Sequence, residues 1–204
     1  QEDIAALLGD TVKTEGLDPV EREELLLSTY RDNLKRCVRS SGKWSARSAY
    51  VRVLDREKER PKYHLVYLTS HPRGIIEFMK ISEGLDQVQK RVRASTKQKA
   101  RAKKSGMDDF FGAASFIDPE QGRVSLSEVE QYWLRYLVGG TKRIDETEFA
   151  NMLEETDWFP ADLQRALWSL IDAGKVRNLD APRKRPKNPL HWENNERLQL
   201  VETA

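Results

Sequence analysis

The sequence predicts a mixed fold in two parts: an α/β segment, and a C-terminal winged-helix domain of α+β type. In the first part a helical pattern precedes two apolar runs, "SAYVRVL" and "YHLVYLTS", which flank a polar turn and indicate an antiparallel hairpin. In the second part three short helical patterns precede two strand patterns around a basic, proline-rich loop. That order is typical of a winged helix. We expect boundaries at residues 1–84, a basic helical connector and loop at 85–124, and the winged helix at 125–204.

The first helix is predicted from Asp18, which is an N-cap residue followed by Pro19 in the first turn. Gly42 is expected to end it. Its apolar face at helical spacing comprises Leu26, Tyr30, Leu34, Cys37 and Val38. We therefore expect Cys37 to be a small core residue, not a nucleophile.

The second strand, "YHLVYLTS", is apolar on both faces, because Tyr63, Leu65 and Tyr67 alternate with Val66 and Leu68. Such a strand is usually buried on both sides, with helices above and below the sheet. Two strands alone do not form a stable sheet. We therefore expect further strands from a preceding part of the polypeptide or from a partner chain. The chain opens with Gln rather than Met, which suggests a portion of something longer. "HPRGIIEFMKISEGLD" then returns to a helical pattern.

The connector is strongly basic, with eight cations and no acid from Lys90 to Lys104. At helical spacing one stripe is formed by Lys90, Arg93, Lys97, Arg101 and Lys104. One interpretation is a helix that lies along nucleic-acid phosphates. The other is a solvated linker helix or a disordered connector, because the opposite side offers little apolar surface. A loop with buried aromatic residues, "GMDDFFGAASFIDPEQG", is expected to follow.

The helices of the C-terminal part carry start and stop signals. Ser127 and Glu130 are expected to form a capping box, and Asp145 and Glu148 a second one. The third helix begins near Pro160 and ends at Gly174, and the strands are predicted in "GKVRNLD" and "NERLQLVE".

This third helix occupies the position of a recognition helix, yet its sequence suits DNA poorly. The residues expected to face outward are Asp162, Gln164, Arg165, Ser169 and Asp172. Among them Arg165 is the strong phosphate or guanine ligand, while the aspartates would repel phosphate. The loop between the strands, "DAPRKRPKNP", suits nucleic acid better. Together with the preceding strand it supplies Arg177, Arg183, Lys184, Arg185 and Lys187. We expect it to contact backbone without reading sequence, or to be a solubilising loop.

Other chemistries lack support in the residues. A net charge of +2 gives no overall attraction to nucleic acid, so charge distribution has to provide it. One cysteine allows no disulfide within the chain, which fits a reducing, cytoplasmic compartment. The histidines, His64, His71 and His191, lack metal-ligand spacing. No glycine-rich phosphate loop or nucleophile elbow is present. We therefore predict no catalytic residue and no metal site. No apolar run approaches the length of a membrane span.

Several segments resemble the C-terminal half of the three-Cys-motif partner (TcmP) family. They are "YRDNLKRC", "YHLVYLTSHPRGIIEFMK" with its Thr69-x-His71-Pro72-x-Gly74 turn, and "LQRALWSLIDAGKV". The resemblance covers residues 20–84 and 125–180 and concerns structural signatures. It implies a methyltransferase-like Rossmann domain before the winged helix, and an association with phage-type, radical-SAM-like three-cysteine partners. It also implies that the hairpin is the end of that Rossmann sheet, with its second strand deep in the sheet. The SAM-binding motif would lie upstream, so no cofactor-binding residue carries over to this chain.

Three functional hypotheses follow. The first is a nucleic-acid-associated protein of a prokaryotic mobile-element or defence system, which binds DNA or RNA through the connector and the wing. The second is the C-terminal half of a SAM-dependent methyltransferase, with SAM bound only if an upstream Rossmann half exists. The third is a scaffold that docks a protein partner through Trp133, Trp158, Trp168 and Trp192.

Overall fold

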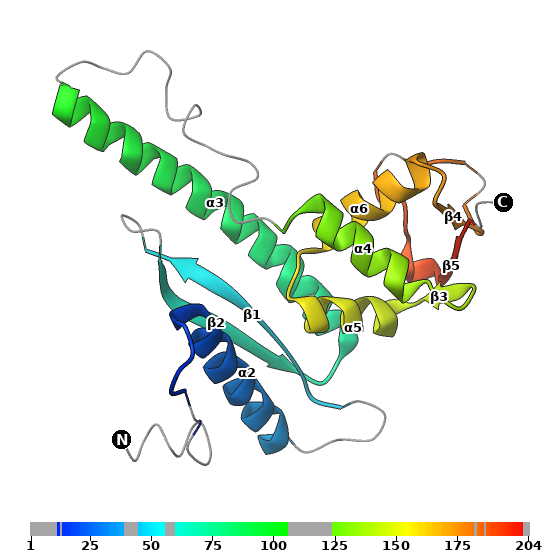
Figure 1. Cartoon of the computed structure of the whole chain (residues 1–204), viewed down its shortest axis with the longest axis horizontal. Coiled ribbons are helices and arrows are strands. Elements are labelled where there is room, and N and C mark those ends of the chain that lie inside the picture. Colours follow the sequence, from blue (N-terminus) through cyan, green and yellow to red (C-terminus); the bar gives the residue numbers. More distant parts are fainter. Residues whose placement is uncertain are drawn as a thin grey trace.

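The structure is a computed structural model that describes residues 12, 14–38, 45–55, 60–105, 124–181, 183–185 and 187–201. In chain order its elements are α2 (Pro19–Cys37), β1 (Arg47–Leu54), β2 (Pro61–Thr69), α3 (Pro72–Ser105), α4 (Leu126–Tyr136), β3 (Lys142–Ile144), α5 (Glu146–Thr156), α6 (Pro160–Asp172), β4 (Val176–Asn178), the 3₁₀ helix η2 (Trp192–Asn194) and β5 (Glu196–Leu200). A hairpin flanked by α2 and α3 lies at one end, and a winged helix built from the remaining elements lies at the other (Figure 1).

Helix α2 begins as predicted. The Asp18 carboxylate accepts hydrogen bonds from the N–H groups of Val20 and Glu21, at 2.7 and 2.9 Å. The helix ends at Cys37, before the expected end at Gly42, which lies outside the described residues. The Cys37 side chain is exposed, so its expected place in the core was wrong. Arg36, which precedes it at the end of α2, is exposed as well.

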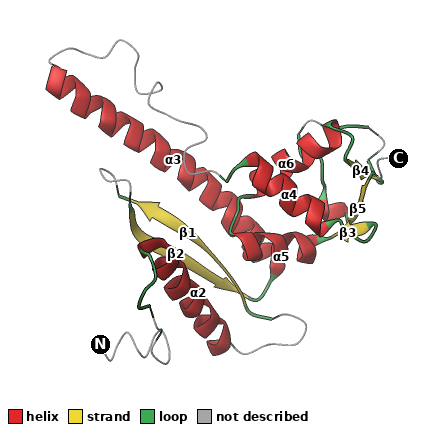
Figure 2. Ribbon diagram, viewed as in Figure 1, coloured by secondary structure: helices red, strands yellow, loops and turns green. Residues whose placement is uncertain are grey.

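The predicted hairpin is confirmed, and its strands pair in antiparallel register from Arg47↔Thr69 to Val53↔Tyr63. One face packs on α2, where Glu23 contacts both His64 (3.0 Å) and Arg52 (3.5 Å). The opposite face packs on α3 (Figure 2). Side chains of β1 therefore alternate between two helical layers, as the pleat requires.

The prediction that β2 is buried on both faces was wrong. Tyr63 is 54% exposed and Leu65 is 46% exposed. Tyr67 stacks on Phe78 of α3, with ring centroids 4.8 Å apart, but the rest of this face has no helix over it. The physical reason is that the two-stranded sheet, β1-β2, has no further strand in the described part of the chain.

Helix α3 follows β2 through a close turn. A Cβ atom on Gly74 would lie 2.7 Å from the Thr69 hydroxyl oxygen, so only glycine fits between the strand end and the first helical turn. The helix then runs without interruption from Pro72 to Ser105. The predicted boundary between residues 84 and 85 thus falls inside one helix, and the division into domains stays a prediction.

The winged helix has the predicted three helices and a sheet of three strands in the order β3-β5-β4. Strand β3 was not predicted from the sequence, because it is only three residues long. The predicted capping box of α4 was wrong, because Ser125 caps that helix and accepts from the N–H of Glu128. Asp145 caps α5 as expected. Glu148 was expected to complete a capping box with it, but the Glu148 carboxylate instead accepts a hydrogen bond from the Tyr136 hydroxyl at 2.7 Å.

A single apolar core joins the hairpin to the winged helix. Ala49 and Val51 of β1, with Ile75 and Met79 of α3, belong to the same buried cluster as the interior of α4, α5 and α6. At its edge Trp192 lies under two cations of α3, Arg73 (5.0 Å) and Lys80 (5.6 Å). The winged helix is therefore held firmly against α3.

Candidate nucleic-acid interface

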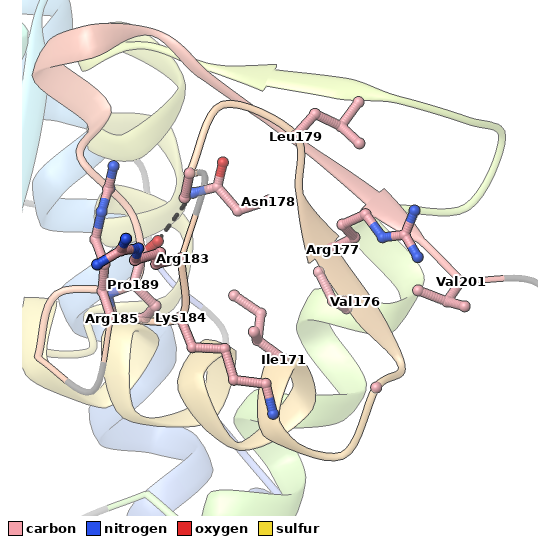
Figure 3. A pocket seen from close by; sticks show the side chains of 12 residues that line it. Ile171, Val176, Arg177, Asn178, Leu179, Arg183, Lys184, Arg185, Pro189 and Val201 are labelled. Carbon is pink, nitrogen blue, oxygen red and sulfur yellow. Dashed lines mark hydrogen bonds between the residues drawn. The ribbon is translucent and has the colours of Figure 1, made fainter.

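The wing is the loop between β4 and β5, residues 179–195, and it borders a hollow of about 600 Å³. The floor of the hollow is apolar and includes Ile171, Val176 and Leu179. Arg177 lies on one side of it, and Arg183, Lys184 and Arg185 lie on the other (Figure 3). The fold thus brings four of the five predicted wing cations around one concavity.

Two of these cations are held by carboxylates. Lys184 pairs with Asp172 at the end of α6, at 3.1 Å. Arg185 pairs at 2.7 Å with Glu196, whose side chain is almost fully buried. Burial alone would raise the pKa of Glu196, but the His191 N–H, Arg185 and Asn178 lower it overall by hydrogen bonding to the charged form. Arg185 therefore anchors the wing to β5.

The remaining wing cations face solvent. Arg177, Arg183 and Lys187 are exposed, and none has an ion-pair partner within the described segments. A guanidinium that is free and fixed on a short strand or loop can form two parallel hydrogen bonds to a phosphate.

The outer face of the three-stranded sheet adds cations that sequence analysis missed. Arg143 of β3 lies directly opposite Arg197 of β5, while the next positions, Ile144 and Leu198, are buried. The Asp180 carboxylate accepts a hydrogen bond from the Arg197 guanidinium at 2.7 Å, and its hydrogen bonds with Arg197 lower the pKa of Asp180 to about 2. Asp180 also attracts Arg143, but Arg143 forms no ion pair or hydrogen bond among the described residues. Its alternation with Ile144 could have revealed it, had the short strand been recognised.

We use the term wing surface for the unpaired cations of the wing and its sheet. They are Arg143, Arg177, Arg183 and Lys187.

Helix α6 has little capacity to read bases. Gln164 is bound to the wing, because its side chain both donates to the Leu190 carbonyl (2.8 Å) and accepts from the Leu190 N–H (3.1 Å). Arg165 is half-buried and lies 3.7 Å from Asp162. Asp162 was expected to face outward, but it is buried and accepts from the Phe159 N–H at the helix start. The exposed side chains of α6 include Trp168 and Asp172.

Residues 99–183 match the family model of the GMT-like wHTH domain. The matched range begins in α3 and ends inside the wing, so it covers α4 to β4 of the winged helix. This wHTH domain has the architecture of many DNA-binding modules, which makes nucleic-acid binding a reasonable expectation for it. Neither the curated proteins nor the solved structures contain a match to the chain.

The basic part of α3, which leads into the wHTH domain, differs from its predicted arrangement. Lys90 is largely buried and pairs with Asp86 at 3.0 Å, so it is not available to phosphate. Arg93 is half-buried, whereas Lys97 and Arg101 are exposed and already interact with other groups. The side chain of Lys104 lies outside the described residues.

A different stripe of α3 is free. Arg91, Lys99 and Lys103 are exposed and have no partner among residues whose positions are described. Their spacing of eight and four residues places them on one side of the helix. These three cations were not predicted, because the whole segment is basic and composition does not show which side of the helix faces the protein.

The tryptophans do not form the predicted docking surface. Trp133 and Trp192 are buried in the core, Trp158 is half-buried, and Trp168 is exposed. Within the described segments, none of the helices combines the length and apolar character that a bilayer crossing requires.

Proposed function

We propose that the protein binds the phosphate backbone of nucleic acid through the wing surface and does so without reading base sequence. The observation that carries this proposal is the pair Arg177 and Arg183, which border one hollow and have no carboxylate partner in the described chain. Arg143 extends the positive surface across the sheet. The similarity to the GMT-like wHTH domain supports the proposal.

Binding without sequence readout follows from α6. Specific contacts in the major groove usually come from Arg, Gln or Asn side chains on the recognition helix. The two such side chains of this helix, Gln164 and Arg165, are occupied by Leu190 and Asp162. Phosphate contacts from the wing surface then supply affinity that is strong at low salt and indifferent to sequence.

The test is a salt titration of binding to a fluorescent duplex of mixed sequence and to its single strand. The double variant Arg177→Gln/Arg183→Gln should reduce the slope of log K against log salt by about 2 on duplex, because each phosphate contact contributes about 0.9. The matched control is Arg22→Gln/Arg36→Gln, which removes the same charge from α2, far from the wing (Figure 1). Undetectable binding at low salt, or equal slopes for both double variants, contradicts the proposal.

The setting in a mobile-element or defence system and the role as part of a methyltransferase remain predictions from the three-Cys-motif partner resemblance. The interaction hypothesis gains an observation of its own, which is the uncovered face of β2.

A further inference from the structure

The two outer edges of the hairpin differ in whether their backbone N–H and C=O groups have hydrogen-bond partners. Side chains satisfy the outer edge of β1: the N–H of Ser48 donates to Glu154 (3.0 Å), and its carbonyl accepts from Arg31 (2.6 Å). Further along, Gln89 accepts from the N–H of Leu54 (2.7 Å) and donates to the carbonyl of Arg52 (3.5 Å). These groups come from three helices, so no further strand can pair with β1 without displacing them.

The outer edge of β2 is open. Ser48 and Arg52 direct their backbone groups away from β2, so their opposite residues, Leu68 and His64, must also direct theirs outward. The same parity applies to Lys62 and Val66. No hydrogen bond reaches the outward backbone groups of these four residues from any described residue. An open strand edge is a template for another strand.

An uncovered apolar surface borders this edge. Tyr63 and Leu65 are exposed on the face of β2 that α3 leaves open. Along α3, Phe78, Ile81, Leu85, Val88 and Val92 recur at alternating spacings of three and four residues. Phe78 stacks on Tyr67, so this stripe begins beside β2, and its other four members are exposed. Such a contiguous surface marks an interaction site.

We propose that this surface pairs with β2 of a second copy of the chain, in antiparallel register about a two-fold axis at Leu65. Leu65 is the midpoint of Pro61–Thr69, so this register pairs the whole strand. Tyr63 then lies opposite Tyr67 of the second copy, and Leu65 lies opposite itself. A second copy suits the site because its β2 presents the same exposed Tyr63, Leu65 and Tyr67 on this face, and a two-fold interface must be self-complementary.

The α3 helices leave room for this arrangement. In the resulting order β1-β2-β2-β1, the two β1 strands are three strand spacings apart, which is about 14 Å. The α3 helices pack mainly over β1, so their axes are separated by a similar distance. This separation exceeds the usual distance between packed helices, which is about 8–10 Å, and the two helices therefore do not overlap. Their exposed stripes and the tyrosines fill the space between them.

Disulfide trapping tests the register. In a Cys37→Ser background, Leu65→Cys should form an intermolecular disulfide under mild oxidation. The two Leu65 residues would be opposite each other without hydrogen bonds between them, and the Cα atoms of such a pair are about 4.5 Å apart, within the range of a disulfide. Tyr63→Cys is the matched control on the same face. It lies opposite Tyr67 of the second copy and should not cross-link to itself. Equal trapping of both variants would overturn this register.

Light scattering tests the assembly. The wild type should have twice the mass of one chain. Val66→Pro removes an outward N–H and should give folded monomers, whereas Leu65→Pro removes an N–H that is bonded to β1 and should unfold the hairpin. Leu65→Arg keeps the backbone intact, places like charges opposite each other at the axis, and should also give monomers. A monomeric wild type, or a dimer that survives both Val66→Pro and Leu65→Arg, overturns the proposal.

Discussion

At the residue scale, the carboxyl group of Asp157 has an unusual environment. Asp157 lies in the turn between α5 and α6 and binds Arg31 at 2.6 Å. Burial raises the pKa of Asp157 to about 6, although Arg31 and the Tyr50 amide act in the opposite direction. The raised value is consistent with the surroundings, because Oδ1 is buried and has no hydrogen-bond partner within the described chain. An oxygen that has lost water without gaining a donor favours the protonated acid.

This group should make stability depend on pH. The folded pKa exceeds the ordinary value, so the folded state holds the proton more tightly than the unfolded state does. The stabilisation is complete below pH of about 4 and is lost as pH rises through about 6, by roughly 2–3 kcal/mol. Asp157→Asn should remove this decline in the free energy of unfolding, measured by urea denaturation from pH of about 4 to 7. Asn suits the left-handed backbone here (φ 53°), so the variant tests charge. An unchanged decline contradicts the assignment.

At the scale of elements, sequence patterns predicted the helices and the hairpin because apolar periodicity and caps are local signals. Asp18 and Asp145 cap helices as expected. The sequence could not show which edge of the hairpin is left open in the described part of the chain, because an exposed Leu65 and a buried one are written alike. The pairing of Lys184 and Arg185 was also hidden, since their partners, Asp172 and Glu196, are distant in sequence. Wing cations were therefore predictable as a group, but their availability was not.

Helix α3 gives a second test at this scale. If it extends the nucleic-acid interface, the free cations Arg91, Lys99 and Lys103 should contact phosphate, whereas Lys90 should not, because Asp86 already binds it. The triple change of these free cations to Gln should lower the slope of log K against log salt by up to about 3 on duplex. Lys90→Gln is the control in the same titration and should leave the slope unchanged. A larger effect from Lys90→Gln than from the triple variant contradicts this view of the helix.

At the scale of the whole molecule, one core makes the hairpin and the winged helix a single body. Arg31 crosses this junction with four hydrogen bonds, to Ser48 (two), Asp157 and Glu154. Pairing through β2 would therefore fix the positions of two wing surfaces relative to each other. The reason is that β2 ends at Thr69 and α3 begins at Pro72, so only a short turn connects the pairing strand to α3. The open edge and the wing surface lie on different parts of the molecule (Figure 1), so assembly leaves the nucleic-acid interface accessible.

A rigid dimer with two wing surfaces should bind long nucleic acid with avidity. The second contact becomes intramolecular once the first has formed, which typically raises apparent affinity by 10²–10⁴, or by about 3–5 kcal/mol. Val66→Pro should lose this gain on a long duplex but bind a short duplex, which reaches one wing surface, as tightly as the wild type does. Arg177→Gln/Arg183→Gln should instead weaken binding to both lengths. Fluorescence anisotropy on the two lengths distinguishes these outcomes. Equal affinities of Val66→Pro and wild type on the long duplex would show that the two surfaces do not act together.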